Sequence, residues 1–199
     1  MVLFLIPLLF GFALVGASAF TAAYSRWWGE RAGEMTSSVL RNFLGIPLWF
    51  YGAIVAWLQP SPFLFNPSIG TKVIGWVFLI AGLVPFIWGH LVIGKPTHMP
   101  SVRDTLVRHS LYAYVRHPIY SGGMLMAVGL ALLKPTSTFF LACIIGFVWL
   151  IIQARLEEID LLQRMLAYRK YMEEVPRFVP RLRKREAGVS PVRAPSHRG

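Results

Sequence analysis

The chain has 199 residues, of which 55% are hydrophobic and 15% are charged, and its mean hydropathy is +0.54. Because soluble domains carry about 25% charged residues, this composition excludes an ordinary soluble domain and indicates a membrane protein. The net charge is +11, but the basic residues lie between apolar segments and in the tail, which favours anionic lipid over nucleic acid as their partner. The single cysteine, Cys143, excludes an intrachain disulfide, and the sequence has no zinc-ligand spacing and predicts no metal site.

Five apolar segments follow one another along the chain, and a membrane-spanning helix needs about 20 mostly apolar residues. The predicted spans are residues 2–24, 43–60, 71–94, 119–133 and 136–154. Only Lys134 and Pro135 separate the last two, which predicts a tight helical hairpin. No Lys or Arg precedes Arg26, so the first segment lacks the basic start of a signal peptide and is expected to remain as a span. The sequence therefore predicts an all-α, polytopic membrane bundle of about five transmembrane helices.

The distribution of basic residues predicts how these spans are oriented. All but two of the 20 Lys and Arg residues fall on one side of the spans, and the exceptions are Lys72 and Lys134. Because cytoplasmic loops carry the excess of positive charge, the N-terminus is expected outside and the C-terminus in the cytoplasm. We expect this multi-pass protein in a bacterial inner membrane rather than the endoplasmic reticulum.

Polar side chains are dense in residues 103–123, "RDTLVRHSLYAYVRHPIYSGG". Pro118 suits the first turn of the fourth span, which places Arg116 and His117 at the N-terminal end of that helix. Free backbone N–H groups at such an end favour an anion or a ligand carboxylate. Arg and Tyr are also ordinary residues of a membrane interface, but that interpretation leaves the density of His, Arg and Tyr unexplained.

A second polar region covers residues 154–180. Apolar residues recur there at helical spacing, which predicts a helix that leaves the membrane with one apolar face. These residues are Leu156, Ile159, Leu162, Met165 and Leu166. The Asp160–Arg164 and Arg169–Glu173 pairs have i,i+4 spacing and are interpreted as solvated ion pairs.

Two adjacent carboxylates, Glu157 and Glu158, stand just after the apolar run of the last span. Carboxylates gain nothing from anionic lipid, so a cationic partner is expected for them. Arg155, the region around Arg116, or a cationic ligand can fill that role. Structural and functional interpretations of the pair both stay open, because charged groups at membrane margins are often functional.

Together the two polar regions resemble the isoprenylcysteine carboxyl methyltransferase family, whose wider relatives include the phospholipid N-methyltransferases. The resemblance covers about residues 97–180. The segments that carry it are "TLV" at 105–107, Tyr112, "RHPIY" at 116–120, "EE" at 157–158, Tyr168, Tyr171 and "VPRFVP" at 175–180. It implies a small helical membrane bundle with S-adenosyl-L-methionine in a cytoplasmic pocket, closed by the polar loop and a C-terminal amphipathic helix.

The resemblance also implies which residues form the site. The cofactor contacts would be Leu106, Val107, Tyr112, His117, Pro118, Tyr120, Glu157 and Glu158. Catalytic roles in the transfer itself would fall to His117, Arg116, Arg155 and Glu158. Four residues before Glu157, where the carboxyl methyltransferases have a substrate-binding arginine, this chain has Gln153.

The function implied by the resemblance is an integral-membrane, S-adenosylmethionine-dependent methyltransferase. Its acceptor would be a lipid-like or isoprenoid molecule from the bilayer that presents a carboxylate or an amine. Three regions follow: residues 1–94 with three N-terminal transmembrane helices, residues 95–180 with the catalytic part, and residues 181–199 as a basic tail predicted to be disordered. Membrane lipids are the other expected partners, and the oligomeric state stays open.

Two alternatives remain. A membrane NADPH-dependent reductase of the enone or sterol type would need more basic residues at its pocket than Arg103, Arg108 and Arg116 to hold the phosphates of a dinucleotide. A non-enzymatic five-span protein with a lipid-binding basic tail would leave "RHPIY" and "EE" without a common reason.

Overall fold

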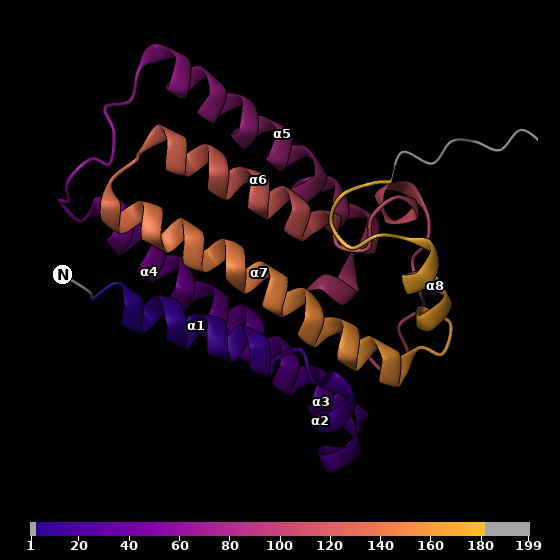
Figure 1. Ribbon diagram of the computed structural model, residues 1–199. Coiled ribbons are helices and arrows are strands. Elements are labelled where there is room, and N and C mark those ends of the chain that lie inside the picture. Colours follow the sequence, from indigo (N-terminus) through magenta and orange to yellow (C-terminus); the bar gives the residue numbers. More distant parts are fainter. Residues whose placement is uncertain (1–2, 182–199) are drawn as a thin grey trace, which may run out of the picture.

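The computed structural model describes residues 3–181, and helices dominate this part of the chain (Figure 1). The helices are α1 (Leu5–Ala17), α2 (Thr21–Trp28), α3 (Glu30–Ser38), η1 (Val39–Gly45), α4 (Ile46–Leu58), α5 (Ile69–Ile93), η2 (Lys95–Thr97), η3 (Ser110–Ala113), α6 (Pro118–Leu133), α7 (Ser137–Arg164) and α8 (Tyr168–Glu174). Residues 3–181 form no strand, and an isolated bridge joins Phe63 to Thr136. The all-α class predicted from the sequence is thus confirmed. The predicted basic tail lies, beyond residue 181, outside the described residues.

Several helices are apolar enough to belong in a membrane, as the composition predicts. Three helical runs, Glu30–Leu58, Ile69–Ile93 and Ser137–Arg164, are long and apolar enough to cross one. α1 and α2 meet the same criteria only as a pair, with a bend of 63° between them, and α6 is a shorter apolar helix. The structure therefore has three helices that could cross a membrane, or four if the bent pair α1–α2 counts as one span. The fifth predicted crossing stays a prediction.

The helical run Glu30–Leu58, which corresponds to the second predicted span, differs from its predicted bounds. Hydropathy marks residues 43–60, whereas the helix begins at Glu30 and runs through α3, the π-helical segment η1 and α4 without interruption. Hydropathy registers only the apolar part of a helix, while backbone hydrogen bonding continues through polar residues when no breaker intervenes. Before it, Gly29 takes φ +87°, a left-handed value that favours glycine, and turns the chain from α2 into α3.

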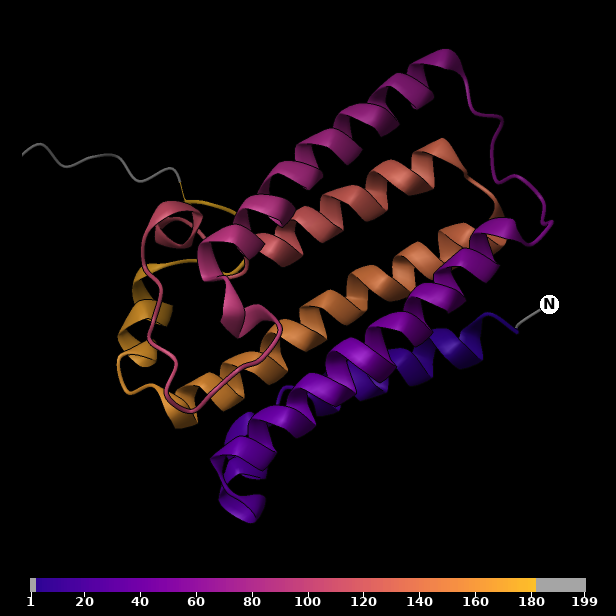
Figure 2. The ribbon, with the colours of Figure 1, turned by 180° about the vertical axis from the view of Figure 1, so that it is seen from behind.

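Two helix pairs flank α7, which packs on α6, α4 and α1 (Figures 1 and 2). α5 and α6 approach so closely that a Cβ on Gly82 would lie 2.5 Å from the carbonyl oxygen of Gly122. α1 and α4 do the same at Gly52, where a Cβ would lie 2.6 Å from the Leu8 nitrogen. Small residues allow such backbone contact between membrane helices. The outer face of α5 is apolar and exposed, for example at Val73 and Val84, as contact with lipid requires.

The C-terminal region is arranged differently from the prediction. α7 continues past residue 154 to Arg164, and a break at Met165 separates it from the seven-residue helix α8. The residues of the predicted apolar face do not share one environment: Ile159 is 49% exposed and Leu166 is 98% exposed, whereas Met165 packs with Tyr168 and Tyr171. The residues that this part of α7 buries are polar, so its acidic side chains rather than its apolar ones point inward.

Candidate functional site

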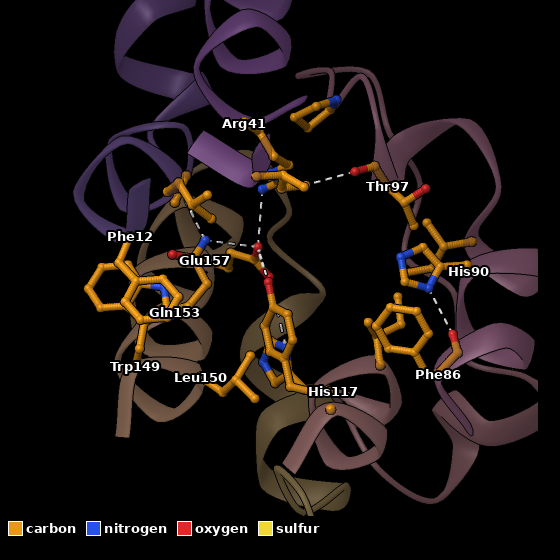
Figure 3. Close-up of a pocket in the computed structure, with 18 of the residues that line it drawn as sticks. Phe12, Arg41, Phe86, His90, Thr97, His117, Trp149, Leu150, Gln153 and Glu157 are labelled. Carbon is orange, nitrogen blue, oxygen red and sulfur yellow. Dashed lines mark hydrogen bonds and ion pairs between the residues drawn. The ribbon is translucent and has the colours of Figure 1, made fainter. Parts of the chain in front are cut away.

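A cavity of about 830 Å³ lies among α1, α4, α5, α6 and α7 and extends beneath the loop that precedes η3. This volume falls within the range of about 300–1,000 Å³ that is usual for small-molecule sites. Apolar side chains line one part of it, including Phe12, Trp49, Ile54, Trp57, Phe139 and Trp149. Polar side chains line the other part, including Arg41, His90, Thr97, His117, Gln153 and Glu157 (Figure 3). The cavity therefore fits a ligand with an apolar body and a polar head.

The start of α6 is held by the segment that follows α8. Pro118 occupies the first turn, as the sequence predicts. The backbone N–H groups of Arg116 and His117 donate to the carbonyl oxygens of Pro176 and Arg177, at 2.9 and 3.0 Å. These bonds bring "RHPIY" and "VPRFVP", which lie about 60 positions apart, into direct contact. Because the N–H of His117 donates to the chain itself, this group is not free to bind an anion.

Glu158 lies at the centre of a buried ionic cluster beneath this corner. Its carboxylate accepts hydrogen bonds from Arg177 Nε and Nη2, at 3.0 and 2.5 Å. His117 Nε2 lies 3.2 Å and Arg116 Nη1 lies 3.3 Å from Oε1 of the same carboxylate. The side chain of Glu158 is 4% exposed, so its charge depends on these partners rather than on water.

Glu157 points into the cavity instead. Its Oε1 accepts hydrogen bonds from the Tyr120 hydroxyl at 2.5 Å, from Arg41 Nη2 at 3.1 Å and from Gln153 Nε2 at 3.2 Å (Figure 3). The Tyr120 ring stacks on His117, with ring centroids 5.4 Å apart and planes inclined by 6°. One carboxylate oxygen of α7 thus links α6, through Tyr120, and η1, through Arg41, at the cavity wall.

Three tyrosines close the cavity beside α8. The Tyr112 hydroxyl donates to the Gly89 carbonyl at 3.3 Å, and the Tyr171 hydroxyl donates to the Tyr112 carbonyl at 2.6 Å. Burial raises the pKa of Tyr171 to about 12 and also raises the pKa values of Tyr112 and Tyr168. These hydroxyls therefore keep their protons at neutral pH, and those of Tyr112 and Tyr171 act as hydrogen-bond donors. Tyr168 and Tyr171 pack with Leu106 in one apolar cluster.

Most residues predicted for the site line this cavity. They are Leu106, Val107, Tyr112, Arg116, His117, Tyr120 and Glu157. Pro118 is buried within the first turn of α6, and Glu158 faces the C-terminal segment rather than the cavity. Arg155 is exposed and does not line the cavity, because two residues along a helix turn its side chain by about 200° from that of Glu157.

Two polar residues that the sequence interpretation did not assign to the site also line the cavity. Arg41 donates to Ser18 Oγ, to the Thr97 carbonyl and to Glu157, at 3.2, 3.1 and 3.1 Å. Gln153 is 1% exposed and lies one turn before Glu157. The i,i+4 spacing of Gln153 and Glu157 was visible in the sequence, but nothing local relates Arg41 to a position more than 100 residues later.

The interpretation of Asp160 and Arg164 as a solvated pair is wrong. Asp160 is 1% exposed, and its carboxylate accepts from the Ala22 backbone at 2.7 Å and from Arg164 Nε at 2.6 Å. Arg164 Nη1 also lies 3.3 Å from Asp104 and contacts the Ser101 carbonyl. This pair fastens the end of α7 to the α1–α2 bend and to the loop over the cavity. Among the described residues, no group of three or more His, Cys, Asp or Glu side chains is arranged to hold a metal ion.

Comparison with known proteins agrees with this arrangement. Residues 71–169 match the family model described as phospholipid methyltransferase, and this range includes α5, α6, α7 and the polar loop. No curated protein and no solved structure matches the chain. Through the matched region, the chain belongs to the isoprenylcysteine/phospholipid methyltransferase family of integral-membrane methyltransferases.

Proposed function

We propose that the protein is an S-adenosylmethionine-dependent methyltransferase that modifies a lipid-like acceptor at the cytoplasmic face of a bacterial inner membrane. In this proposal the chain crosses the membrane five times, with α1 and α2 as one bent span and α6 as a short one. The observation that carries the proposal is the joint lining of one cavity by His117 and Tyr120 of "RHPIY" and by Glu157 of "EE", in a chain whose family performs methyl transfer.

The polar part of the cavity fits the cofactor's functional groups. Arg116 lines the cavity. Its buried Nε has no hydrogen-bond partner among the described residues, and its Nη1 forms no hydrogen bond there but lies 3.3 Å from Glu158 Oε1 as an ion pair. A buried guanidinium with unsatisfied N–H groups is costly and fits the carboxylate of an amino-acid head. Glu157 fits an ammonium or a ribose hydroxyl, and Leu106 with Tyr112 offers an apolar and aromatic surface for adenine.

The apolar part of the cavity fits the tail of the acceptor. Phe50 and Ile54 of α4 line the cavity and are 56% and 42% exposed, and we propose that a lipid reaches the site past them from within the bilayer. The N-terminal helices, residues 1–94, would hold this tail, and residues 95–180 would hold the cofactor. S-adenosylmethionine, when bound, supplies a methyl group on a positively charged sulfur. The residues of the chain then align donor and acceptor and exclude water, which is how such transfers gain most of their rate.

Binding of S-adenosylhomocysteine to the detergent-purified protein tests the proposal. Glu157→Gln and Arg116→Lys should each weaken binding at least tenfold, about 1.4 kcal/mol, because the first loses a charge and the second loses the planar fork of the guanidinium. Isothermal titration calorimetry measures the affinity, and thermal unfolding without ligand checks the fold. Arg169→Gln, an exposed change on α8, is the matched control and should bind as the parent does. Stabilisation by NADPH without any binding of S-adenosylhomocysteine would contradict the proposal.

A further inference from the structure

His90 of α5 lines the cavity opposite Glu157 (Figure 3). It was not among the residues expected at the site, because it lies within an apolar segment, in the last turn of α5. Gly89, the residue before it, accepts the hydrogen bond from the Tyr112 hydroxyl. His90 is thereby tied to one of the residues proposed to hold the cofactor.

One hydrogen bond fixes the tautomer of His90. Its Nδ1 lies 2.7 Å from the carbonyl oxygen of Phe86, one helical turn earlier. A carbonyl oxygen can only accept, so Nδ1 carries a proton and Nε2 of the neutral ring carries a lone pair. Within residues 3–181 no hydrogen bond to Nε2 occurs, and Figure 3 shows the ring edge opposite Phe86 turned toward the cavity.

The groups around His90 keep it in place and define its surroundings. The His98 ring stacks beside it, with centroids 6.2 Å apart, and the Phe86 ring lies 4.7 Å from it by the same measure. The charged or titratable side chains that line the same cavity include Arg41, Asp104, Arg116, His117, Tyr120, Glu157, Asp160 and Arg164. Arg41 and Glu157 are paired with each other at 3.1 Å, so neither faces His90 as an isolated charge.

A base at this position suits only an acceptor that gives up a proton. A carboxylate nucleophile is already deprotonated and needs no base, whereas an N–H or O–H nucleophile must lose its proton. Gln153 does not supply a base, because its Nε2 donates to Glu157 and to the Val15 carbonyl and its Oε1 is buried.

We propose that His90 Nε2 is the catalytic proton acceptor of the reaction and that the methyl acceptor is an N–H or O–H nucleophile rather than a carboxylate. This inference rests on the proposed methyltransferase function. The nucleophile's proton passes to Nε2, a new bond forms between its nitrogen or oxygen and the methyl carbon, and the carbon–sulfur bond breaks with its electron pair kept by sulfur.

The variant His90→Asn removes the proposed base and keeps the other hydrogen bond of the side chain. The asparagine amide can still donate to the Phe86 carbonyl, but nothing replaces Nε2. With tritiated S-adenosylmethionine and a total membrane lipid extract as acceptor, we expect label in products that resist mild alkali, as N-methyl and O-alkyl methyl groups do, and a loss of about 100-fold or more in the variant. Binding of S-adenosylhomocysteine should stay within twofold of the parent. His109→Asn, at an exposed histidine outside the cavity, should react as the parent does.

A second measurement is independent of turnover. Nitrogen-15 spectra of histidine-labelled protein without ligand should show His90 as the tautomer with a proton on Nδ1, assigned by loss of that signal in His90→Asn. Alkali-labile label, which marks methyl esters, or an unchanged rate in His90→Asn would overturn the inference while leaving the methyltransferase proposal intact. Absence of both S-adenosylhomocysteine binding and lipid labelling would instead overturn the proposed function, and this inference with it.

Discussion

Glu157 and Glu158 are chemically identical neighbours that have different partners. Consecutive residues of a helix point about 100° apart, so Glu157 faces the cavity while Glu158 faces the C-terminal segment. Glu157 contacts Tyr120, Arg41 and Gln153 at the cavity wall. Glu158 is enclosed by two arginines and His117. The first carboxylate therefore lies where we propose that the ligand binds, and the second attaches the C-terminal segment.

Glu158→Gln should destabilise the protein by about 3–5 kcal/mol, because it leaves buried cationic partners without their counter-charge. Thermal unfolding in detergent measures the loss, and Glu173→Gln, an exposed change on α8, is the control that should leave the unfolding temperature unchanged. Equal unfolding temperatures for Glu158→Gln and the parent would show that the cluster around Glu158 does not hold the structure together.

At the scale of elements, α7 carries a polar stripe formed by Gln153, Glu157, Asp160 and Arg164. Their spacing of four, three and four residues places them on one helix face, and all four line the cavity. α5 and α6 instead pack through glycines, so that their backbones meet without intervening side chains. His90 of α5 lies across the cavity from Glu157 of this stripe (Figure 3), and the Tyr112 hydroxyl of η3 donates to the neighbouring Gly89 carbonyl.

Gly82→Ala tests the contact between α5 and α6. The new methyl group would lie 2.5 Å from the Gly122 carbonyl oxygen, so the helices must separate, at a cost of about 1–3 kcal/mol for such overpacking. Gly70→Ala is the matched control, because its Cβ would meet only Ser68 Oγ at 3.7 Å and alanine favours the helix by about 1 kcal/mol. We expect the first change to lower the unfolding temperature in detergent and the second to leave it unchanged or raise it. The reverse order would exclude close packing at Gly82 as a source of stability.

At the scale of the whole molecule, the two ends of the bundle have different roles. The polar loop, α8 and the ends of α2 and α7 gather at one end (Figure 1). At the other end the connection before α5 is fastened to the α6–α7 turn by the bonds from the Leu64 nitrogen to the Pro135 carbonyl and from the Ser137 nitrogen to the Pro62 carbonyl, both 2.8 Å. In the proposed orientation, which follows the positive-inside rule, the first end faces the cytoplasm, where S-adenosylmethionine would be available.

Single-cysteine labelling in a Cys143→Ala background tests this orientation. Lys170→Cys on α8 should react with a membrane-impermeant maleimide only after the cytoplasmic side is opened. Asn66→Cys, at the opposite end of the bundle, should react from outside in intact cells. Both positions are exposed in the structure, so failure to react cannot be ascribed to burial. Labelling of residue 170 from outside would overturn the proposed orientation.

The sequence by itself determined the all-α class and the family. Apolar runs mark helices because lipid requires every backbone group to be satisfied within its own segment. Motifs such as "RHPIY" and "EE" point to the family, whose model matches residues 71–169. The helix starting at Pro118 was also predictable, since proline fixes the first turn locally. These features depend on residues that are close together in the chain.

Tertiary structure alone decided which polar groups face the cavity. Arg41 meets Glu157 across more than 100 positions, Asp160 is buried by the α1–α2 bend, and Arg155 turns outward although it stands beside the carboxylates. In the sequence, His90 is a single polar residue in an apolar span. In the structure it lines the cavity, where its Nδ1 bonds to the Phe86 carbonyl and the neighbouring Gly89 accepts from Tyr112. Hydropathy averages over all faces of a helix, whereas the inward face is selected by the neighbours that pack against it, and those neighbours are distant in sequence.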